Sequence, residues 1–154
     1  MNGLRIRDAR PSDIPQLLQF EQELVKAERP FDPTIRPDPV SYYDLREYVT
    51  SGMVKVVVAE VDGKIVSSGY AYEKEARPYL DHATYAHLGF MYTVPEYRGK
   101  GINKKLIDVL LDWARSNELT EVRLTVYDDN TSAIKAYEKV GFTNHLQEMR
   151  LRLK

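Results

Sequence analysis

The stretch Val94-Pro95-Glu96-Tyr97-Arg98-Gly99-Lys100-Gly101-Ile102-Asn103 decides how the rest of this chain is organised. The segment before it, residues 87–94, is apolar and β-branched, which indicates a buried strand. After it, from Ile102 to Trp113, apolar residues recur at helical spacing. The first amides of a helix lack partners within the helix, and the aligned peptide dipoles add partial positive charge there. A strand, a basic glycine-rich turn and a helix therefore predict an anion site, with pyrophosphate as the best-fitting ligand.

The composition of the turn favours the same interpretation. Gly99 and Gly101 allow the backbone to turn sharply and to approach a ligand without a Cβ in the way. Formal positive charge comes from four neighbouring side chains, namely Arg98, Lys100, Lys104 and Lys105.

The turn also resembles the acyl-CoA-binding turn of the GCN5-related N-acetyltransferases, the GNAT family. That family's motif is Gln/Arg-x-x-Gly-x-Gly/Ala, and it reads Arg98-Gly99-Lys100-Gly101-Ile102-Asn103 in this chain. Asn103 departs from the pattern, because it stands where the family has glycine or alanine. The resemblance implies that acetyl-CoA is the cofactor and that the turn binds it through Arg98, Gly99, Lys100, Gly101, Asn103 and Lys104.

Bulk composition sets the class of protein. The chain has 154 residues, of which 43% are hydrophobic and 29% charged, so we expect a single globular domain over residues 1–154. A net charge of −1 argues against a nucleic-acid-binding protein. No apolar run approaches the roughly 18–20 residues that a membrane span needs, so no membrane association is expected.

Cysteine is absent from the sequence, which excludes disulfides, thiolate metal ligands and a cysteine nucleophile. We expect no metal site. The first residues, Met-Asn-Gly-Leu-Arg, lack the apolar stretch of a signal peptide. Together these features favour a cytoplasmic location.

Periodicity and turn residues divide the chain into ten elements. We predict strands over residues 4–7, 54–61, 65–75, 83–94, 122–127 and 149–153, and helices over 12–26, 41–50, 102–116 and 131–140. The resulting order, βααβββαβαβ, is the one expected of an acetyltransferase of the family that the turn resembles. It implies an α/β fold with a mixed central sheet flanked by helices.

A second family signature spans Asn130 to Phe142. In similar enzymes the asparagine binds the pantetheine arm, and a tyrosine seven residues later points at the cofactor sulfur. Seven residues are two helical turns, so Asn130 and Tyr137 share one face of the predicted helix. Tyr137 is therefore the expected proton donor to the departing thiolate. The alternative is that Asn130 only caps the helix and Tyr137 only fills the core.

The central strand carries two further expectations from the resemblance. Members of the family splay a bulged strand away from its neighbour, and its free backbone groups bind pantetheine as a further strand would. The matching positions are Met91 and Thr93, both through main-chain atoms. Alternation places Leu88 and Phe90 together on the core face and His87 on the opposite face.

The attacking amine must be neutral, so a base is expected on the same strand. His87 stands where related enzymes carry Glu or His, and an ordinary histidine titrates near neutrality. A purely structural histidine is an equal alternative. Tyr85, on the same face, and Glu73, across the predicted hairpin, are the other candidate bases.

The acceptor wall is expected in the acidic and aromatic segment from Phe20 to Tyr43. Carboxylates and aromatic faces attract ammonium groups, and we expect the substrate to contact Glu28, Phe31, Asp32 and Tyr85. The alternative for the carboxylates is a solvated surface. Arg29 and Arg36, in the same loop, could instead receive a substrate carboxylate.

The sequence thus predicts an N-acetyltransferase that moves an acetyl group from acetyl-CoA to a primary amine of a small molecule or peptide by direct attack. A catalytically inactive acyl-CoA sensor with the same fold is the alternative. A dinucleotide-binding protein is disfavoured, because the turn lacks the third glycine of that fingerprint. Many relatives are dimers, so a homodimer also remains open.

Overall fold

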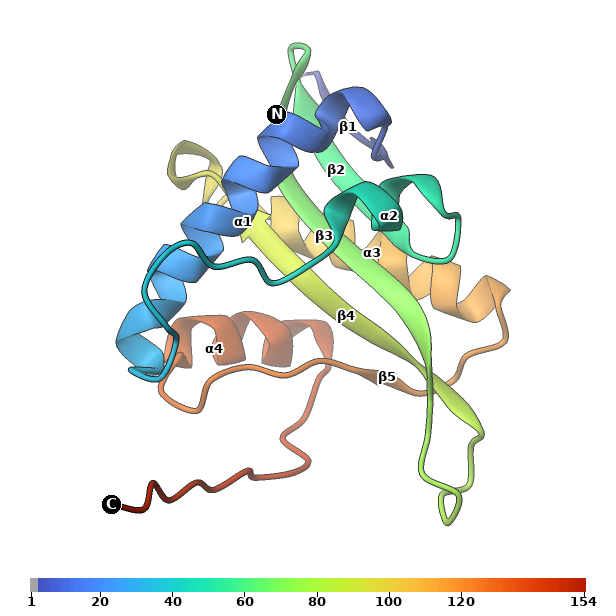
Figure 1. Cartoon of the computed structure of the whole chain (residues 1–154). Helices are drawn as coiled ribbons and strands as arrows, with labels where there is room; N and C mark the ends of the chain where they lie inside the picture. The colour runs from blue at the N-terminus through green and yellow to red at the C-terminus, as the bar shows by residue number, and fades with distance from the viewer. Residues whose placement is uncertain (1–2) are drawn as a thin grey trace.

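A five-stranded mixed sheet forms the centre of the computed structural model, which describes residues 3–154 (Figure 1). The strands are β1 (Leu4–Asp8), β2 (Lys55–Val61), β3 (Lys64–Glu75), β4 (Thr84–Thr93) and β5 (Val122–Arg123). They lie in sequence order, antiparallel from β1 to β4, whereas β5 runs parallel to β4. The helices are α1 (Ile14–Glu28), α2 (Leu45–Thr50), α3 (Ile102–Ser116) and α4 (Thr131–Val140). The predicted α/β architecture is thereby confirmed.

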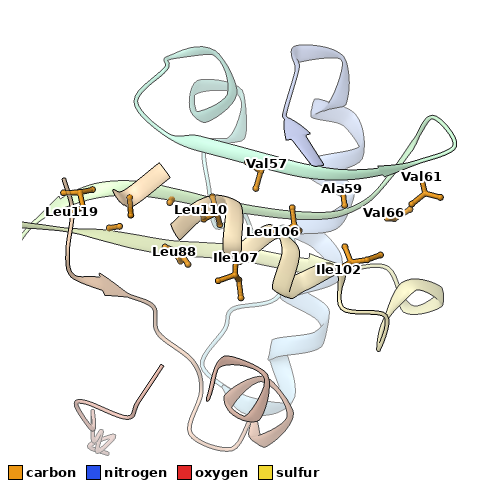
Figure 2. Packing of buried hydrophobic residues seen from close by; sticks show 13 residues of the cluster. Val57, Ala59, Val61, Val66, Leu88, Ile102, Leu106, Ile107, Leu110 and Leu119 are labelled. Atoms are coloured by element: carbon orange, nitrogen blue, oxygen red, sulfur yellow. The ribbon is translucent and has the colours of Figure 1, made fainter. Parts of the chain in front are cut away.

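Two apolar clusters lie on opposite faces of the sheet. Helices α1 and α2 cover one face through Leu17, Phe20 and Leu45, which pack with Val56 and Val58 of β2. Helix α3 covers the other face, where Figure 2 shows its apolar side chains against β2 and β4. The labelled members of this second cluster include Val57, Ala59, Leu88, Ile102, Leu106, Ile107 and Leu110. Strand β2 is thus buried on both faces, which explains its unbroken run of apolar residues.

The predicted second helix begins later than expected, at Leu45 rather than Ser41. Asp44 caps it by accepting a hydrogen bond from the Glu47 amide at 3.3 Å. The residues before the cap are held in another way. The carboxylate of Glu21, which is 1% exposed, accepts hydrogen bonds from the amides of Tyr42 and Tyr43, each at 2.8 Å. Glu21 therefore fixes the approach to α2 and belongs to the scaffold.

An irregularity interrupts the pairing of β3 with β4. Ser68 pairs with Tyr92, but Tyr70 pairs with Gly89, so β4 has one more residue than β3 between these two pairs. Phe90 lies in the bulge and has a φ of +57°, an uncommon conformation for a bulky residue. The bulge reverses the alternation: Leu88 packs on the α3 side and Phe90 on the α1–α2 side. The prediction that Leu88 and Phe90 share a face is therefore wrong.

The C-terminal segment differs most from the predicted elements. The strand expected over residues 149–153 is not formed, and β5 stops at Arg123 instead of reaching Tyr127. A strand needs a ladder partner, and no backbone hydrogen bond joins residues 143–154 to the rest of the part described. Apolar alternation indicated two strands but did not supply the pairing that would make them.

Membrane-spanning helices and metal clusters were also expected to be absent. Within residues 3–154, no helix combines the length and hydropathy needed to cross a bilayer. No group of three potential metal-ligating side chains comes together in the same residues. Two expectations involve residues 1–2, which lie outside the described part. These are a single domain over residues 1–154 and the lack of a signal peptide, which was inferred from the first five residues.

We predict that Glu21→Ala destabilises the fold by about 3 kcal/mol, because two buried hydrogen bonds to a charged acceptor are lost. Urea unfolding monitored by circular dichroism measures the change. Glu23→Ala, on the same helix but with only an exposed hydrogen bond from Gln19, is the matched control. Equal midpoints for the two variants would show that Glu21 has no such role.

Candidate active site

The turn before α3 has the geometry of an anion site. Gly99 and Gly101 adopt φ values of +74° and +79°, and a Cβ built on either would meet nothing within 4 Å. The first helical hydrogen bond runs from the Lys105 amide to the Gly101 carbonyl at 3.3 Å, which leaves the amides of residues 102–104 without intrahelical partners. No side chain within residues 3–154 caps this helix start. The open cradle and the free amides therefore fit a phosphate group.

Three of the four basic side chains around the turn already have partners within the chain, and this changes their expected roles. Arg98 donates from Nε to the Thr93 carbonyl at 2.8 Å, and its guanidinium lies 5.7 Å from the centre of the Tyr92 ring. Lys100 lies over the Tyr97 ring at 5.1 Å. Lys104 forms a salt bridge with Asp108 at 2.9 Å. Arg98 thus braces the turn against the end of β4, and Asp108 offsets part of the charge of Lys104.

The edge of β4 beyond the bulge is free to bind an extended ligand. Strand β5 pairs with β4 only at Ala86 and His87, so β4 continues to Thr93 without a described partner on that side. The Val94 amide donates to the Val66 carbonyl at 2.9 Å, and pairs alternate along an antiparallel ladder, so the main-chain groups of Thr93 point away from β3. The Thr93 carbonyl is taken by Arg98, which leaves the Thr93 amide for a ligand.

The side chain of Met91 packs in the core. A Cβ built on Gly69 would lie 2.7 Å from the Sδ of Met91. The Met91 side chain also packs with the α3 cluster. The side chain is therefore core, as expected of a residue that would bind a ligand only through its main chain.

Helix α4 carries the second signature, and Tyr137 on it packs against the α3 cluster. Asn130 caps the helix by accepting a hydrogen bond from the Ala133 amide at 3.3 Å, so its amide nitrogen is the part left for another contact. Tyr137 is partly buried and packs against Phe142, with 5.9 Å between the ring centres. Burial, helped by the negative charge of Glu28, raises the pKa of Tyr137 to about 12. The phenol therefore stays protonated at neutral pH, as a proton donor must.

Glu28 is the carboxylate of the predicted acceptor wall that lies near Tyr137. It lies close enough to Tyr137 and Tyr127 for its charge to raise the pKa of both phenols. Burial raises the pKa of Glu28 itself, and the Tyr42 hydroxyl beside it opposes that shift. The Tyr42 hydroxyl is buried, and its geometry with Glu28 falls short of a full hydrogen bond. Among residues 3–154 the Tyr42 hydroxyl thus lacks a hydrogen-bond partner other than the nearby Glu28 carboxylate.

Asp32 and its neighbours are committed to contacts within the chain. Hydrogen bonds from Thr34 hold the pKa of the Asp32 carboxyl below its usual range, and Tyr127 and Arg150 contribute to the same shift. Tyr127 donates to Asp32 at 3.2 Å, and its ring stacks on Phe31 with 6.0 Å between the centres. Phe31 and Asp32 therefore support the wall and have less capacity to contact an acceptor than Glu28.

Arg29 in the same loop has partners within the chain. Arg29 donates to the carbonyls of Ile35 and Arg36 and forms a salt bridge with Asp38 at 2.8 Å. Its guanidinium is thus used to shape the loop, which weakens the alternative that it receives a substrate carboxylate.

His87 lies on the α1–α2 face among aromatic rings. Tyr72 is 5.2 Å and Tyr70 is 6.3 Å from the imidazole centre. Burial, with Lys74 adding a smaller contribution, lowers the pKa of His87, so the imidazole is neutral at pH 7. Glu73 pairs with Ala86 and so points to the opposite face of the sheet from His87, while Tyr85 lies under the Arg123 guanidinium at 4.7 Å. Of the three candidate bases, His87 is the one that borders Tyr70 and Tyr72 and has its pKa lowered by burial.

The aromatic cluster that joins Glu28 to His87 was not predicted from the sequence. Tyr43 contacts both Tyr70 and Phe90, each with 5.3 Å between ring centres, and Tyr48 packs on Tyr70 at 5.7 Å. Gly89 lets Tyr70 come this close, because a Cβ there would lie 2.6 Å from the Tyr70 hydroxyl. Tyr70 and Tyr72 alternate along β3, and this period of two was the available signal.

A surface hollow lined by Arg77, Leu80 and His82 lies at the tip of the β3–β4 hairpin. That tip is at the opposite end of β4 from the Arg98–Gly101 turn, so the hollow plays no part in the site described above.

Comparison with known proteins points to one family. The model of the acetyltransferase (GNAT) family matches residues 19–142. Mouse thialysine N-epsilon-acetyltransferase is 27% identical over 92% of this chain and 85% of its own length. The mycothiol acetyltransferase of Tsukamurella paurometabola is 34% identical over 56% of this chain and only 28% of its own. Several curated relatives are thus much longer than the region that they share with this chain.

Solved structures agree on the fold. A single-site mutant of protein BH1408 of Bacillus halodurans superposes with a TM-score of 0.85 at 19% identity, over 97% of this chain and 99% of its own. A predicted acetyltransferase of Clostridium acetobutylicum, solved with acetyl-CoA, gives a TM-score of 0.74 at 19% identity, over 97% and 96%. At these identities the similarity shows the fold, and one of the neighbours carries the expected cofactor.

Proposed function

Because this chain belongs to the acetyltransferase (GNAT) family, whose enzymes use acetyl-CoA, we propose that it transfers an acetyl group from acetyl-CoA to a primary amine. The observation that carries the proposal is the combination of an uncapped helix start at α3 with a bulged, half-unpaired β4 that leads directly into it. The first binds a diphosphate and the second an extended arm. Amine acceptors are also what the name of the mouse relative indicates.

In this proposal the amides of residues 102–104 bind the diphosphate of coenzyme A, and Gly99 and Gly101 allow the close approach. Arg98 acts chiefly by bracing the turn through the Thr93 carbonyl, and Lys100 and Lys104 supply charge. The pantetheine arm follows β4, with the Thr93 amide and the Met91 main chain as partners. Asn130 reaches it through the side-chain nitrogen that its capping bond leaves free.

The amine enters from the side of α1. Glu28 attracts the ammonium form, and the tyrosine cluster around Tyr43 and Tyr70 provides aromatic faces beside it. His87 borders the same cluster and is neutral at pH 7, so it can accept the proton that the amine must lose, directly or through water. The acceptor class that fits is a cationic primary amine, on a small molecule or on a peptide.

Acetyl transfer then needs no covalent enzyme intermediate. The amine nitrogen forms a bond to the thioester carbonyl carbon, and the carbon–sulfur bond breaks. Tyr137 gives its proton to the departing thiolate and is reprotonated from solvent, while the proton of the amine goes to His87. Donors near the bulge would stabilise the developing oxyanion. A cytoplasmic location and the absence of a nucleic-acid partner complete the proposal.

The whole proposal is tested by binding and turnover together. Acetyl-CoA should raise the melting temperature and NAD should not, and a panel of amines should release thiol from acetyl-CoA. Stabilisation by NAD alone would remove the cofactor assignment. Stabilisation by acetyl-CoA without turnover on any amine would favour the alternative, an acyl-CoA sensor with the same fold.

Tyr137→Phe should lower kcat by about 100-fold, the usual size of a lost general acid, and leave the affinity for coenzyme A almost unchanged. Thiol release measures kcat, and isothermal titration measures the affinity. Because the variant keeps the ring that packs on Phe142, its stability should stay within error of the parent. An unchanged kcat would show that the proton comes from elsewhere.

Glu28→Gln should raise the KM for cationic amines by about tenfold, equivalent to about 1.4 kcal/mol, with little change in the KM for acetyl-CoA. Glu23→Gln, on the same helix, is the matched control. Asp32→Asn should have the smaller effect on KM, since that carboxylate is occupied by Thr34, Tyr127 and Arg150. Equal KM values for the Glu28 and Glu23 variants would mean that Glu28 is only a surface carboxylate.

The pH dependence of kcat/KM tests His87. The pKa of His87 is lowered by burial and by Lys74, and only the neutral imidazole accepts a proton. Activity should therefore decrease as the pH is lowered, with a midpoint below 6.5. His87→Ala should lower the rate at pH 7 and remove that limb. If His87→Ala leaves the pH profile unaltered, Glu28 becomes the candidate base. Its raised pKa would place the acidic limb of the profile above pH 4.5.

A further inference from the structure

Strand β3 carries two adjacent serines at the point where its pairing with β4 breaks. Ser67 and Ser68 are both fully buried, with 0% of each residue exposed. Neither takes part in the mechanism proposed above. A buried hydroxyl costs free energy unless it is hydrogen-bonded, so the partners of these two side chains indicate their role.

Each hydroxyl donates to a main-chain carbonyl of β4. Ser68 Oγ donates to the Phe90 carbonyl at 3.0 Å. Ser67 Oγ donates to the Tyr92 carbonyl at 2.7 Å and lies 2.8 Å from the Thr93 hydroxyl. Because the single hydroxyl hydrogen of Ser67 is used on the carbonyl, Thr93 is the donor in the second contact. Two side chains of β3 thus hold two carbonyls of the bulged strand.

The bulge explains why side chains are needed here. Strand β4 has one more residue than β3 between the Ser68–Tyr92 and Tyr70–Gly89 pairs. The backbone donors of β3 therefore no longer match the carbonyls of β4 one to one. A hydroxyl extends from the strand and can rotate towards its acceptor, so the serines can supply donors where the main chain is out of step.

A carbonyl that is held in place also fixes the amide of the same peptide unit. The peptide bond is planar and trans, so its N–H points away from its C=O. The Phe90 carbonyl shares a peptide unit with the Met91 amide, and the Tyr92 carbonyl shares one with the Thr93 amide. With both carbonyls held by β3, both amides point to the other side of β4, where no strand within residues 3–154 pairs beyond His87.

The two amides differ in their distance from the anion site. Thr93 is the last residue of β4 and leads into the turn before α3. Met91 is one strand repeat further from that turn, roughly 6.6–6.8 Å along the strand. An arm that starts at a diphosphate on α3 and runs back along β4 therefore meets the Thr93 amide first and the Met91 amide nearer its acyl end.

We propose that Ser67 and Ser68 are positioning residues for the pantetheine arm of acetyl-CoA. Ser67 orients the Thr93 amide, which binds the part of the arm next to the diphosphate, and so governs the affinity for coenzyme A. Ser68 orients the Met91 amide, which donates to the acyl end of the arm, and so governs the rate of transfer. The inference rests on the proposed acetyl transfer, from which it takes the path of the arm along β4.

Kinetics with acetyl-CoA separate the two serines. Ser67→Ala should raise the KM for acetyl-CoA and the dissociation constant of coenzyme A by about tenfold, with little change in kcat, because an orienting hydrogen bond is lost. Ser68→Ala should instead lower kcat by about tenfold through misplacement of the acyl group. It should leave the dissociation constant of coenzyme A, which has no acyl group, unchanged. Thiol release measures the rate, and isothermal titration measures the affinity.

Infrared spectroscopy reports on the acyl end in the absence of an amine. In the complex with acetyl-CoA that is isotope-labelled at the thioester carbonyl, a hydrogen bond from the Met91 amide polarises that carbonyl and lowers its stretching frequency. Ser68→Ala should reduce this shift, and Ser67→Ala should leave it as in the parent.

Two kinds of variant separate positioning from a general loss of stability. Val61→Ala, at the last residue of β2, truncates a buried side chain of the α3 cluster but removes no hydroxyl between β3 and β4. Its KM, kcat and infrared shift should match those of the parent at a temperature where circular dichroism shows both folded. Ser67→Cys and Ser68→Cys keep the side-chain shape with a much weaker donor, and should repeat the alanine results if an alanine variant does not fold.

The parent and the variants test different statements. If the parent binds and turns over acetyl-CoA while both serine variants match Val61→Ala, the positioning role is wrong and acetyl transfer stands. Equal losses of affinity and rate in the two serine variants would also overturn the positioning role, because the serines would then only support the fold. A parent that does not bind coenzyme A would remove the proposed function, and the positioning role with it.

Discussion

The bulge in β4 is the constraint on which the rest of the site depends. One additional residue between the Ser68–Tyr92 and Tyr70–Gly89 pairs turns Phe90 towards α1 and keeps Leu88 on α3. On its other side β4 pairs with β5 only at Ala86 and His87, before the bulge is reached. The edge that would bind pantetheine and the face that would receive the amine therefore meet at one local break in a ladder.

Two of the positive charges at the turn before α3 already have partners within the chain. Arg98 is tied to the Thr93 carbonyl and Lys104 to Asp108, so neither has to be ordered when a diphosphate binds. The backbone amides remain the unsatisfied groups at this position. Asn103, where the family pattern has glycine or alanine, lies in the first turn of the helix and presents its amide in the same way as its neighbours.

Three carboxylates near the proposed acceptor site differ in role because their surroundings differ. Glu21 is buried and holds the approach to α2, Asp32 is saturated by the loop around it, and Glu28 keeps capacity beside Tyr42. Charge alone could not separate these three residues. Their distances to amides and hydroxyls do so, because a carboxylate that already accepts several hydrogen bonds has less to offer a substrate.

The sequence by itself determined the order of the elements as far as α4, the glycine turn before α3, the positions of Asn130 and Tyr137 at the start of α4 and two turns along it, and the strand that carries His87. These features rest on local rules: helical and strand periods, glycine at positive φ, and residues two helical turns apart. Only the tertiary structure decided the register break at Phe90, the division of labour among Glu21, Glu28 and Asp32, and the failure of residues 149–153 to form a strand within one chain. Each of these depends on what lies opposite a residue across the sheet or between elements distant in sequence, and a period along the chain carries no information about that neighbour.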